Sequence, residues 1–176
     1  MSAAFRILCV CMGNVCRSPT AEAVLRQLIE HNGLGGRIEV ASAGTHGYRV
    51  GAVSDASSQR VAWAKGYDLS AIRARKIGWQ DLEDFDLILA MDKANLNNLQ
   101  RMATEAQQPR IRLFMDYATH FAEDEIPDPY LTLGGRFERV LEMIEDAGRG
   151  LVEQLKRQFG EAASQVPDSS ARITKP

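Results

Sequence analysis

The chain has 176 residues, of which 45% are apolar and 25% charged. These values favour one globular domain with its own core and exclude a fibrous or intrinsically disordered chain. The formal net charge of -2 argues against a dedicated nucleic-acid-binding protein, which usually carries a basic excess. No stretch approaches the roughly 18 consecutive apolar residues of a membrane helix, and the first residues show no signal-peptide pattern.

Strands and helices are predicted to alternate along the chain. We expect strands at residues 5–10, 38–43, 86–91 and 110–115. We expect helices at residues 19–31, 55–65, 79–84, 94–102 and 136–159. Ser18 would cap the first helix, Pro19 would occupy its first position, and Gly148 and Gly150 would relax the last helix. The predicted domain spans residues 1–160, and the polar residues 161–176 would form a loosely ordered tail.

This alternation predicts an α/β fold with a parallel sheet and helices on both of its faces. Ligands in such folds bind at the carboxyl ends of the strands. The turn directly after the first strand is therefore the first place to look for a functional site.

That turn combines a reactive group with an anion cradle, and it reads Cys11-Met12-Gly13-Asn14-Val15-Cys16-Arg17-Ser18. A loop that closes onto a helix N-terminus points backbone N–H groups inward, which suits a phosphate. Gly13 and Asn14 are the residues best able to adopt the left-handed dihedrals that such a loop needs. The sequence thus predicts a phosphate-binding loop.

The chemistry is expected from Cys11 and Arg17. The guanidinium of Arg17 can bind two phosphate oxygens and stabilise transition-state charge. The helix dipole and Arg17 would favour the thiolate of Cys11, and the Ser18 hydroxyl could donate a hydrogen bond to it. A thiolate beneath a bound phosphate is placed for in-line attack.

The three cysteines Cys9, Cys11 and Cys16 do not form the evenly numbered, dispersed set of a disulfide scaffold. They fit a reducing, cytoplasmic setting in which a thiol can stay reactive. Cys16 could form a reversible disulfide with Cys11 and protect it from over-oxidation, or be an inert buried thiol. Cys9 is expected in the core.

The segment from Val10 to Pro19 resembles the signature of the low-molecular-weight protein tyrosine phosphatases, and the resemblance extends to about Phe159. It includes Ser42-Ala43-Gly44-Thr45, Ala90-Met91-Asp92 and Ile126-Pro127-Asp128-Pro129-Tyr130. The resemblance implies a flavodoxin-like, four-stranded parallel sheet of order 2-1-3-4, with no metal or other cofactor. It also implies hydrolysis of phosphotyrosine and small aryl phosphate monoesters through a phosphocysteine intermediate.

Expelling a phenolate requires a proton donor, and Asp128 is the candidate. From spacing alone, Asp128-Pro129 is an ordinary turn signal in the long loop 117–132. In the family, the aspartate of this Asp-Pro motif is the general acid. The resemblance therefore assigns that role to Asp128.

Further residues have supporting roles that the resemblance implies. Asn14 and Ser42 would hold the phosphate loop in shape, although Ile72 stands where many relatives have a histidine bonded to this asparagine. Asp92 is either a helix cap or a group that orders the polar residues near Asp128. Tyr48 and Tyr130 would form the aromatic walls of a deep slot. Relatives often have two tyrosines in tandem at Tyr130, whereas here Leu131 takes the second place.

Three other functions were weighed. Arsenate reductases share the loop but need further cysteines, and no cysteine follows Cys16. Protein arginine phosphatases look similar but typically have Thr where Val15 stands. A non-catalytic phosphate-binding module would be expected to lack Cys11, Arg17 or Asp128. We therefore expect a monomeric, at most weakly self-associating enzyme that acts on a phosphotyrosine protein such as a tyrosine kinase, without nucleic-acid or membrane partners.

Overall fold

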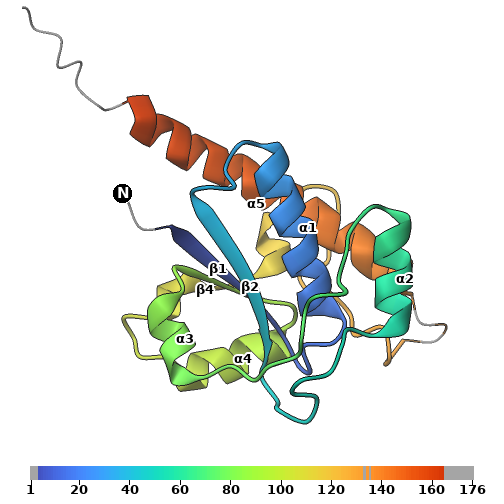
Figure 1. The fold of residues 1–176 in the computed structure, drawn as a ribbon. Coiled ribbons are helices and arrows are strands. Elements are labelled where there is room, and N and C mark those ends of the chain that lie inside the picture. Colours follow the sequence, from blue (N-terminus) through green and yellow to red (C-terminus); the bar gives the residue numbers. More distant parts are fainter. Residues whose placement is uncertain (1–3, 133, 135, 165–176) are drawn as a thin grey trace, which may run out of the picture.

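The computed structural model describes residues 4–132, 134 and 136–164, and it has the expected α/β architecture (Figure 1). The four parallel strands are β1 (Phe5–Cys11), β2 (Ile38–Gly44), β3 (Leu87–Ala90) and β4 (Ile111–Leu113), in the order β2-β1-β3-β4. The helices are α1 (Arg17–His31), α2 (Ala56–Ala64), α3 (Trp79–Asp84), α4 (Lys93–Met102) and α5 (Phe137–Ser164). Short 3₁₀ turns occupy Gln108–Arg110 and Phe114–Tyr117.

Strand β1 lies inside the sheet and is covered on both faces. Ile7 and Cys9 belong to the core that includes residues of α1 and α5, whereas Leu8 and Val10 pack with residues of α3 and α4. Figure 1 shows these helix pairs on opposite sides of the sheet. Burial on both faces explains why this strand is a continuous apolar run.

The start of α1 differs from the prediction. The helix begins at Arg17, two residues before Pro19, and Cys16 rather than Ser18 is the N-cap residue. Ser18 cannot serve as the cap because its hydroxyl is engaged with the Cys11 sulfur and the Asn14 amide. The predicted stop at Asn32-Gly33 is confirmed: Asn32 is the C-cap and Gly33 has a left-handed φ of 70°.

Helix α5 also differs, because it is continuous through Gly148 and Gly150 and extends to Ser164. These glycines permit close packing. A Cβ on Gly150 would lie 1.9 Å from the Tyr117 carbonyl oxygen, and one on Gly148 would lie 3.0 Å from the Leu28 side chain. Residues 161–164, which were expected to begin a loosely ordered tail, continue α5, and residues 165–176 lie outside the described part of the chain.

The predicted fourth strand, 110–115, was too long. Only Ile111–Leu113 pairs with β3, and the chain then turns as a 3₁₀ helix at Phe114–Tyr117. After this turn, the chain continues as the long loop that ends at α5. The predicted loop 117–132 therefore starts at the carboxyl edge of the sheet.

The loops at this edge are joined by backbone hydrogen bonds. Thr45 N donates to Cys11 O, Met91 N donates to Val10 O, and Ile126 N donates to Met91 O, at 2.8 to 3.0 Å. The segments that follow β1, β2, β3 and β4 therefore meet at one place, as expected for a parallel α/β sheet.

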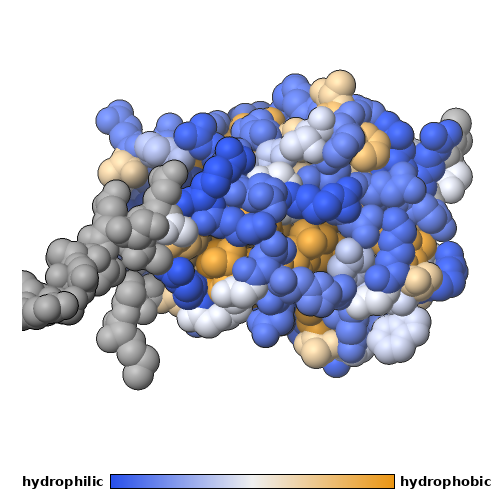
Figure 2. All heavy atoms as spheres, turned by 90° about the horizontal axis from the view of Figure 1, so that it is seen from above, coloured by the Kyte–Doolittle hydropathy of each residue, from blue (hydrophilic) through white to orange (hydrophobic). Residues whose placement is uncertain are grey.

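The outer surface is mostly polar on the face shown in Figure 2, where hydrophilic residues surround small, separate apolar areas. Among the described residues, no helix is both long and apolar enough to cross a membrane.

Candidate active site

The phosphate loop curls around the Cys11 sulfur. Asn14 has a left-handed φ of 55°, and its backbone N–H points at the sulfur with N and Sγ 3.3 Å apart. The Ser18 oxygen lies 3.0 Å from the same sulfur, whose residue is only 3% exposed. The Asn14 amide donates to the Ser18 oxygen at 2.9 Å, so the Ser18 proton can point at the sulfur or at the Ala43 carbonyl, 3.4 Å away. These donors stabilise negative charge on Cys11.

The curl also requires a small residue on the neighbouring strand. A Cβ on Gly44, the last residue of β2, would lie 2.8 Å from the Met12 carbonyl oxygen and 3.1 Å from the Asn14 nitrogen. His46 N donates to the same Met12 carbonyl at 2.9 Å. The backbone of β2 therefore supports the phosphate loop by direct contact.

Asn14 is held from three sides. Its Nδ2 donates to Ser18 Oγ and to Ser42 Oγ, each at 2.9 Å, and its Oδ1 accepts from the Arg75 backbone N–H at 2.9 Å. Ile72, which replaces the family histidine, packs against the hydrophobic core instead. The Arg75 backbone thus supplies a tether to Asn14 in a chain that lacks the histidine.

Sequence reasoning missed two residues that extend this network. The Ser42 hydroxyl donates to Glu22 Oε2 at 2.5 Å, and Glu22 Oε1 pairs with Arg26 Nη2 at 2.6 Å. Glu22 is buried in α1. The available signal was a glutamate between Ala21 and Ala23 on a helix whose neighbouring positions were predicted to be core.

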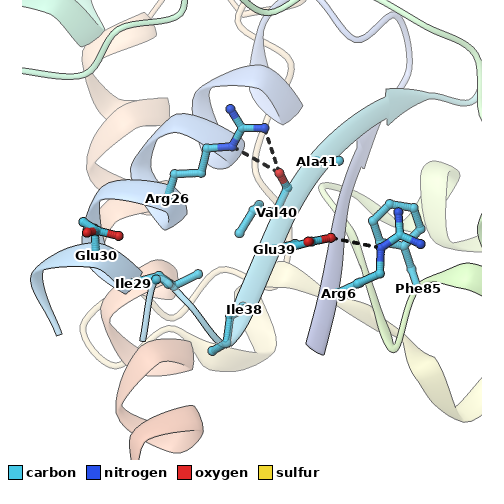
Figure 3. A pocket seen from close by; sticks show the side chains of 10 residues that line it. Arg6, Arg26, Ile29, Glu30, Ile38, Glu39, Val40, Ala41 and Phe85 are labelled. Carbon is cyan, nitrogen blue, oxygen red and sulfur yellow. Dashed lines mark hydrogen bonds and ion pairs between the residues drawn. The ribbon is translucent and has the colours of Figure 1, made fainter. Parts of the chain in front are cut away.

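Arg26 marks the outer end of the network, in a cavity of about 500 Å³ at the side of β2 (Figure 3). Its guanidinium reaches across to the Val40 carbonyl, to which Nε and Nη2 donate at 3.1 and 3.0 Å. Val40 lies on the edge strand, so this carbonyl would otherwise lack a strand partner. The cavity is separate from the phosphate loop and touches it only through this chain of polar contacts.

Arg17 connects the phosphate loop to two other segments. Its Nη1 donates to Asp92 Oδ2 at 2.6 Å and to the Ile126 carbonyl at 3.0 Å, and its Nη2 lies 3.4 Å from Asp128 Oδ2. Burial alone would lower the pKa of Arg17, but Cys11, Asp92 and Asp128 outweigh this effect and raise it. The guanidinium is therefore a permanent cation that interacts with Cys11.

Asp92 has both of the functions that the sequence left open. One carboxylate oxygen caps α4 by accepting from Asn95 N at 2.7 Å, and the other holds Arg17. Because Asp92 both caps α4 and bonds Arg17, it fixes the Arg17 guanidinium relative to the sheet.

The loop that carries Asp128 is attached at Ile126, which is fully buried. The N–H of Ile126 donates to the carbonyl oxygen of Met91, the residue that follows β3. The carbonyl oxygen of Ile126 accepts from Arg17 Nη1. Asp128 follows two residues later, with Oδ1 accepting from Tyr130 N at 3.0 Å. The structure thus brings Cys11, Arg17 and Asp128 together from β1, α1 and a loop more than 100 residues away.

A cleft of about 230 Å³ lies beside the phosphate loop, and Val15, Tyr48 and Tyr130 all line it. Tyr48 is 62% exposed, and its hydroxyl lies 3.0 Å from the place of a Cβ on Gly13. Partial burial and a hydrogen bond to Asp55 raise the pKa of Tyr130. Both tyrosines therefore line this cleft, and Met12 is exposed at the loop surface.

Cys16 is a different kind of thiol. It is buried, and its sulfur accepts a hydrogen bond from Ser58 Oγ at 3.0 Å. Burial raises the pKa of Cys16 to about 12, so it is a neutral thiol at physiological pH. Cys9 is fully buried in the core, as expected.

Comparison with known proteins tests the resemblance. Residues 6–161 match the family model described as low molecular weight phosphotyrosine protein phosphatase. The chain belongs to this family. A low molecular weight protein-tyrosine-phosphatase of Streptomyces coelicolor is 40% identical over 166 residues, which cover 90% of this chain and 99% of that protein.

Relatives of solved structure agree with this membership. Low molecular weight protein-tyrosine-phosphatase YfkJ of Bacillus subtilis is 36% identical over 86% of this chain and 96% of its own length. The YfkJ crystal structure aligns with a TM-score of 0.84, covering 89% of this chain and 98% of that one. An Entamoeba histolytica protein tyrosine phosphatase with Hepes in its active site is 34% identical and aligns with a TM-score of 0.83, covering 90% and 99%.

Proposed function

We propose that this low molecular weight protein tyrosine phosphatase works through Cys11 as nucleophile, Arg17 as phosphate clamp and Asp128 as general acid and base. Family membership gives the overall activity, hydrolysis of phosphotyrosine through a phosphocysteine. The observation that supports these roles is the cluster itself. The buried Cys11 sulfur faces the Asn14 N–H, and Arg17 in the same loop reaches Asp128.

In the first step, the Cys11 thiolate attacks phosphorus, so that an S–P bond forms while the P–O bond to the aryl group breaks. Asp128 gives its proton to the departing aryl oxygen, which leaves as a neutral phenol. Arg17 and the loop N–H groups bind the phosphoryl oxygens and stabilise their charge in the transition state.

In the second step, the Asp128 carboxylate takes a proton from water as the water oxygen attacks phosphorus. The S–P bond breaks, and inorganic phosphate and the thiolate are released. The hydrogen bonds from Ser18 and Asn14 stabilise the departing thiolate. The loop residues Met12, Gly13, Val15 and Cys16 supply the rest of the cradle in this proposal.

We also propose that the cleft selects phosphotyrosine. Val15, Tyr48 and Tyr130 offer apolar and aromatic contacts to a phenyl ring. The short phosphoserine side chain would not carry its phosphate past these walls to Cys11. Val15 lacks the hydroxyl that would suit a guanidinium, which disfavours phosphoarginine.

The natural substrate in this proposal is a phosphotyrosine protein such as a tyrosine kinase, encountered by a monomeric enzyme in the cytoplasm. We propose that a peroxide oxidises Cys11 to the sulfenic acid, that the Cys16 thiol displaces water from it to form the Cys11–Cys16 disulfide, and that a thiol reductant restores both cysteines. The face of the molecule drawn in Figure 2 has no continuous apolar stripe through which two copies could associate, and this supports the proposed monomer.

The test is hydrolysis of p-nitrophenyl phosphate in the presence of EDTA, followed by a comparison of matched phosphotyrosine and phosphoarginine peptides. We expect EDTA-resistant turnover, preference for phosphotyrosine, and no turnover by Cys11→Ser. A Cys9→Ala variant, altered in the core of β1, should retain activity per folded molecule. Normal turnover by Cys11→Ser would disprove the covalent mechanism, and preference for phosphoarginine would disprove the assigned substrate.

A further inference from the structure

The loop that carries Asp128 is clamped at its beginning by a buried carboxylate of α5. Asp146 is only 1% exposed, yet it accepts hydrogen bonds from three successive backbone N–H groups. Its Oδ2 accepts from Thr119 N, His120 N and Phe121 N at 3.0, 2.9 and 3.2 Å. One buried side chain therefore satisfies three consecutive donors of a segment that belongs to no helix or strand.

The second oxygen of Asp146 is also used by this segment. Its Oδ1 lies 2.9 Å from Thr119 Oγ1 and 2.8 Å from His120 Nδ1. Burial raises the pKa of Asp146, but the hydrogen bonds from His120, Phe121 and Thr119 outweigh it and lower the pKa well below its usual range. Asp146 is thus a carboxylate at neutral pH, and both oxygens face the loop.

Other residues on α5 hold the same loop. One turn after Asp146, Gly150 lets the Tyr117 carbonyl approach to a position that a Cβ would block. One end of α5 contributes Arg139, which pairs with Glu123 and stacks over the Phe121 ring at 5.3 Å. Phe137 meets the Tyr130 ring edge-on at 5.8 Å. Helix α5 therefore contacts the loop before and after Asp128.

We propose that Asp146 is a positioning residue for the general acid, acting by fixing the start of the loop 118–132 relative to the phosphate site. Between this clamp and the anchor at Ile126, residues 122–124 are exposed. With Asp146 in place, the loop is held at both ends of this exposed stretch. Without it, the path of the chain into Asp128 would be set by the buried Ile126 contacts and by exposed pairs such as Arg139–Glu123 and Lys93–Asp124. This proposal rests on the proposed role of Asp128.

The test measures how kcat/KM depends on the leaving group, using p-nitrophenyl phosphate and phenyl phosphate. A well-placed acid matters most for phenyl phosphate, because phenolate is the poorer leaving group. In Asp146→Asn, one set of donors would face the amide NH₂ whichever way the amide is turned. We expect kcat/KM to fall about tenfold with phenyl phosphate and less than about threefold with p-nitrophenyl phosphate. Inhibition by inorganic phosphate should stay unchanged.

If Asp146→Asn fails to fold, two variants of Thr119 test the same proposal with a smaller change to the structure. Thr119→Val removes the hydroxyl that bonds Asp146, whereas Thr119→Ser keeps it; Thr119 is exposed, so neither variant disturbs the core. In Thr119→Val we expect kcat/KM to fall more with phenyl phosphate than with p-nitrophenyl phosphate, which is the leaving-group effect. In Thr119→Ser we expect wild-type kcat/KM with both substrates. His120→Ala, at a residue 79% exposed, should show the effect weakly, and His31→Ala at the end of α1 should show none.

An equal loss on both substrates with weaker phosphate inhibition would overturn the positioning role, because it would indicate general damage to the site. So would unchanged kinetics in Asp146→Asn and Thr119→Val. Asp128→Asn, measured alongside, separates the two proposals. If it lacks the leaving-group effect, the role of Asp128 fails; if it shows the effect and the Asp146 and Thr119 variants do not, only the positioning role fails.

Discussion

The phosphate loop and the loop that carries Asp128 reach the same catalytic site by different means. In the phosphate loop, Cys11, Asn14, Arg17 and Ser18 are all buried, and side chains hold the backbone in an otherwise unfavourable curl. In the second loop, Tyr130 and Leu131 are 57% and 85% exposed, and backbone groups are held by Arg17 and by α5. The first arrangement provides a rigid anion cradle, while the second leaves a loop tip that a substrate can contact.

The two loops also differ in how far apart in the sequence their contacting residues lie. The cradle is built from residues close together in the chain, whereas Asp128 meets Arg17 across 111 positions. Changes in the cradle should affect phosphate binding and chemistry together. Changes in the second loop should affect chemistry while leaving phosphate binding intact.

The largest expected effect is at Arg17, where the two loops meet. Arg17→Lys keeps the charge but loses the planar fork that bonds phosphate, Asp92 and the Ile126 carbonyl. We expect kcat/KM for p-nitrophenyl phosphate to fall about 10³-fold and inhibition by phosphate to weaken. Arg60→Lys, on an exposed position of α2, should have no effect. A loss below about threefold would contradict the clamp.

Asp128 tests the second half of the comparison. Asp128→Asn should lower kcat/KM about 10²-fold without weakening inhibition by phosphate, because it removes proton transfer but none of the groups proposed to bind phosphate. Asp116→Asn, on an exposed residue before the loop, is the control. Weaker phosphate binding in Asp128→Asn would show that the loops are not separable.

Asn14 tests how far the cradle depends on its side-chain network. Asn14→Ala should lower kcat/KM about tenfold and the free energy of unfolding by about 2 kcal/mol, from lost hydrogen bonds and left-handed strain. Asn14→Gly relieves the strain but not the lost bonds, so it should recover stability more than activity. Urea unfolding and steady-state kinetics measure the two quantities, with Asn97→Ala on α4 as control. Full activity in Asn14→Ala would mean that the backbone curls without this support.

The smallest effect concerns acid stability. The pKa of Asp146 is lowered on folding, so its carboxylate stabilises the folded state above its unfolded pKa of about 3.9. This contribution is lost as the pH falls from about 4 through the lower folded pKa. The difference in unfolding free energy between wild type and Asp146→Asn should therefore shrink as the pH falls below about 4. Urea titrations at these pH values would show a constant difference if another group caused the stabilisation.

The sequence predicted features that depend on neighbours in the chain. The apolar run of β1, the following loop and the glycine stop of α1 all have local signals, and most elements were placed within a few residues. The cap of α1 was misplaced because the bonds of Ser18 to Cys11 and Asn14 exist only once the loop has curled. The relaxation expected at Gly150 in α5 was wrong because this glycine admits the Tyr117 carbonyl, which comes from a distant segment.

The site shows the same limit. Cys11 and Arg17 could be inferred from spacing, but Asp128 alone read as an ordinary turn and needed the family resemblance. Glu22 and Asp146 were missed because a buried carboxylate is recognisable only from the donors around it, and these lie on other segments. The Arg75 tether of Asn14 uses a backbone N–H, which no residue type reveals.

The partners of Arg17 have a consequence for turnover. Asp92, the Ile126 carbonyl and Asp128 occupy three of the five N–H donors of the Arg17 guanidinium, and a phosphate that binds Nη2 competes there with Asp128. This competition lowers the affinity for any oxyanion, including the product. As inorganic phosphate departs, internal acceptors are ready to replace it, so the enzyme need not leave a buried cation unpaired. Product escape and transition-state binding are therefore balanced within a single side chain.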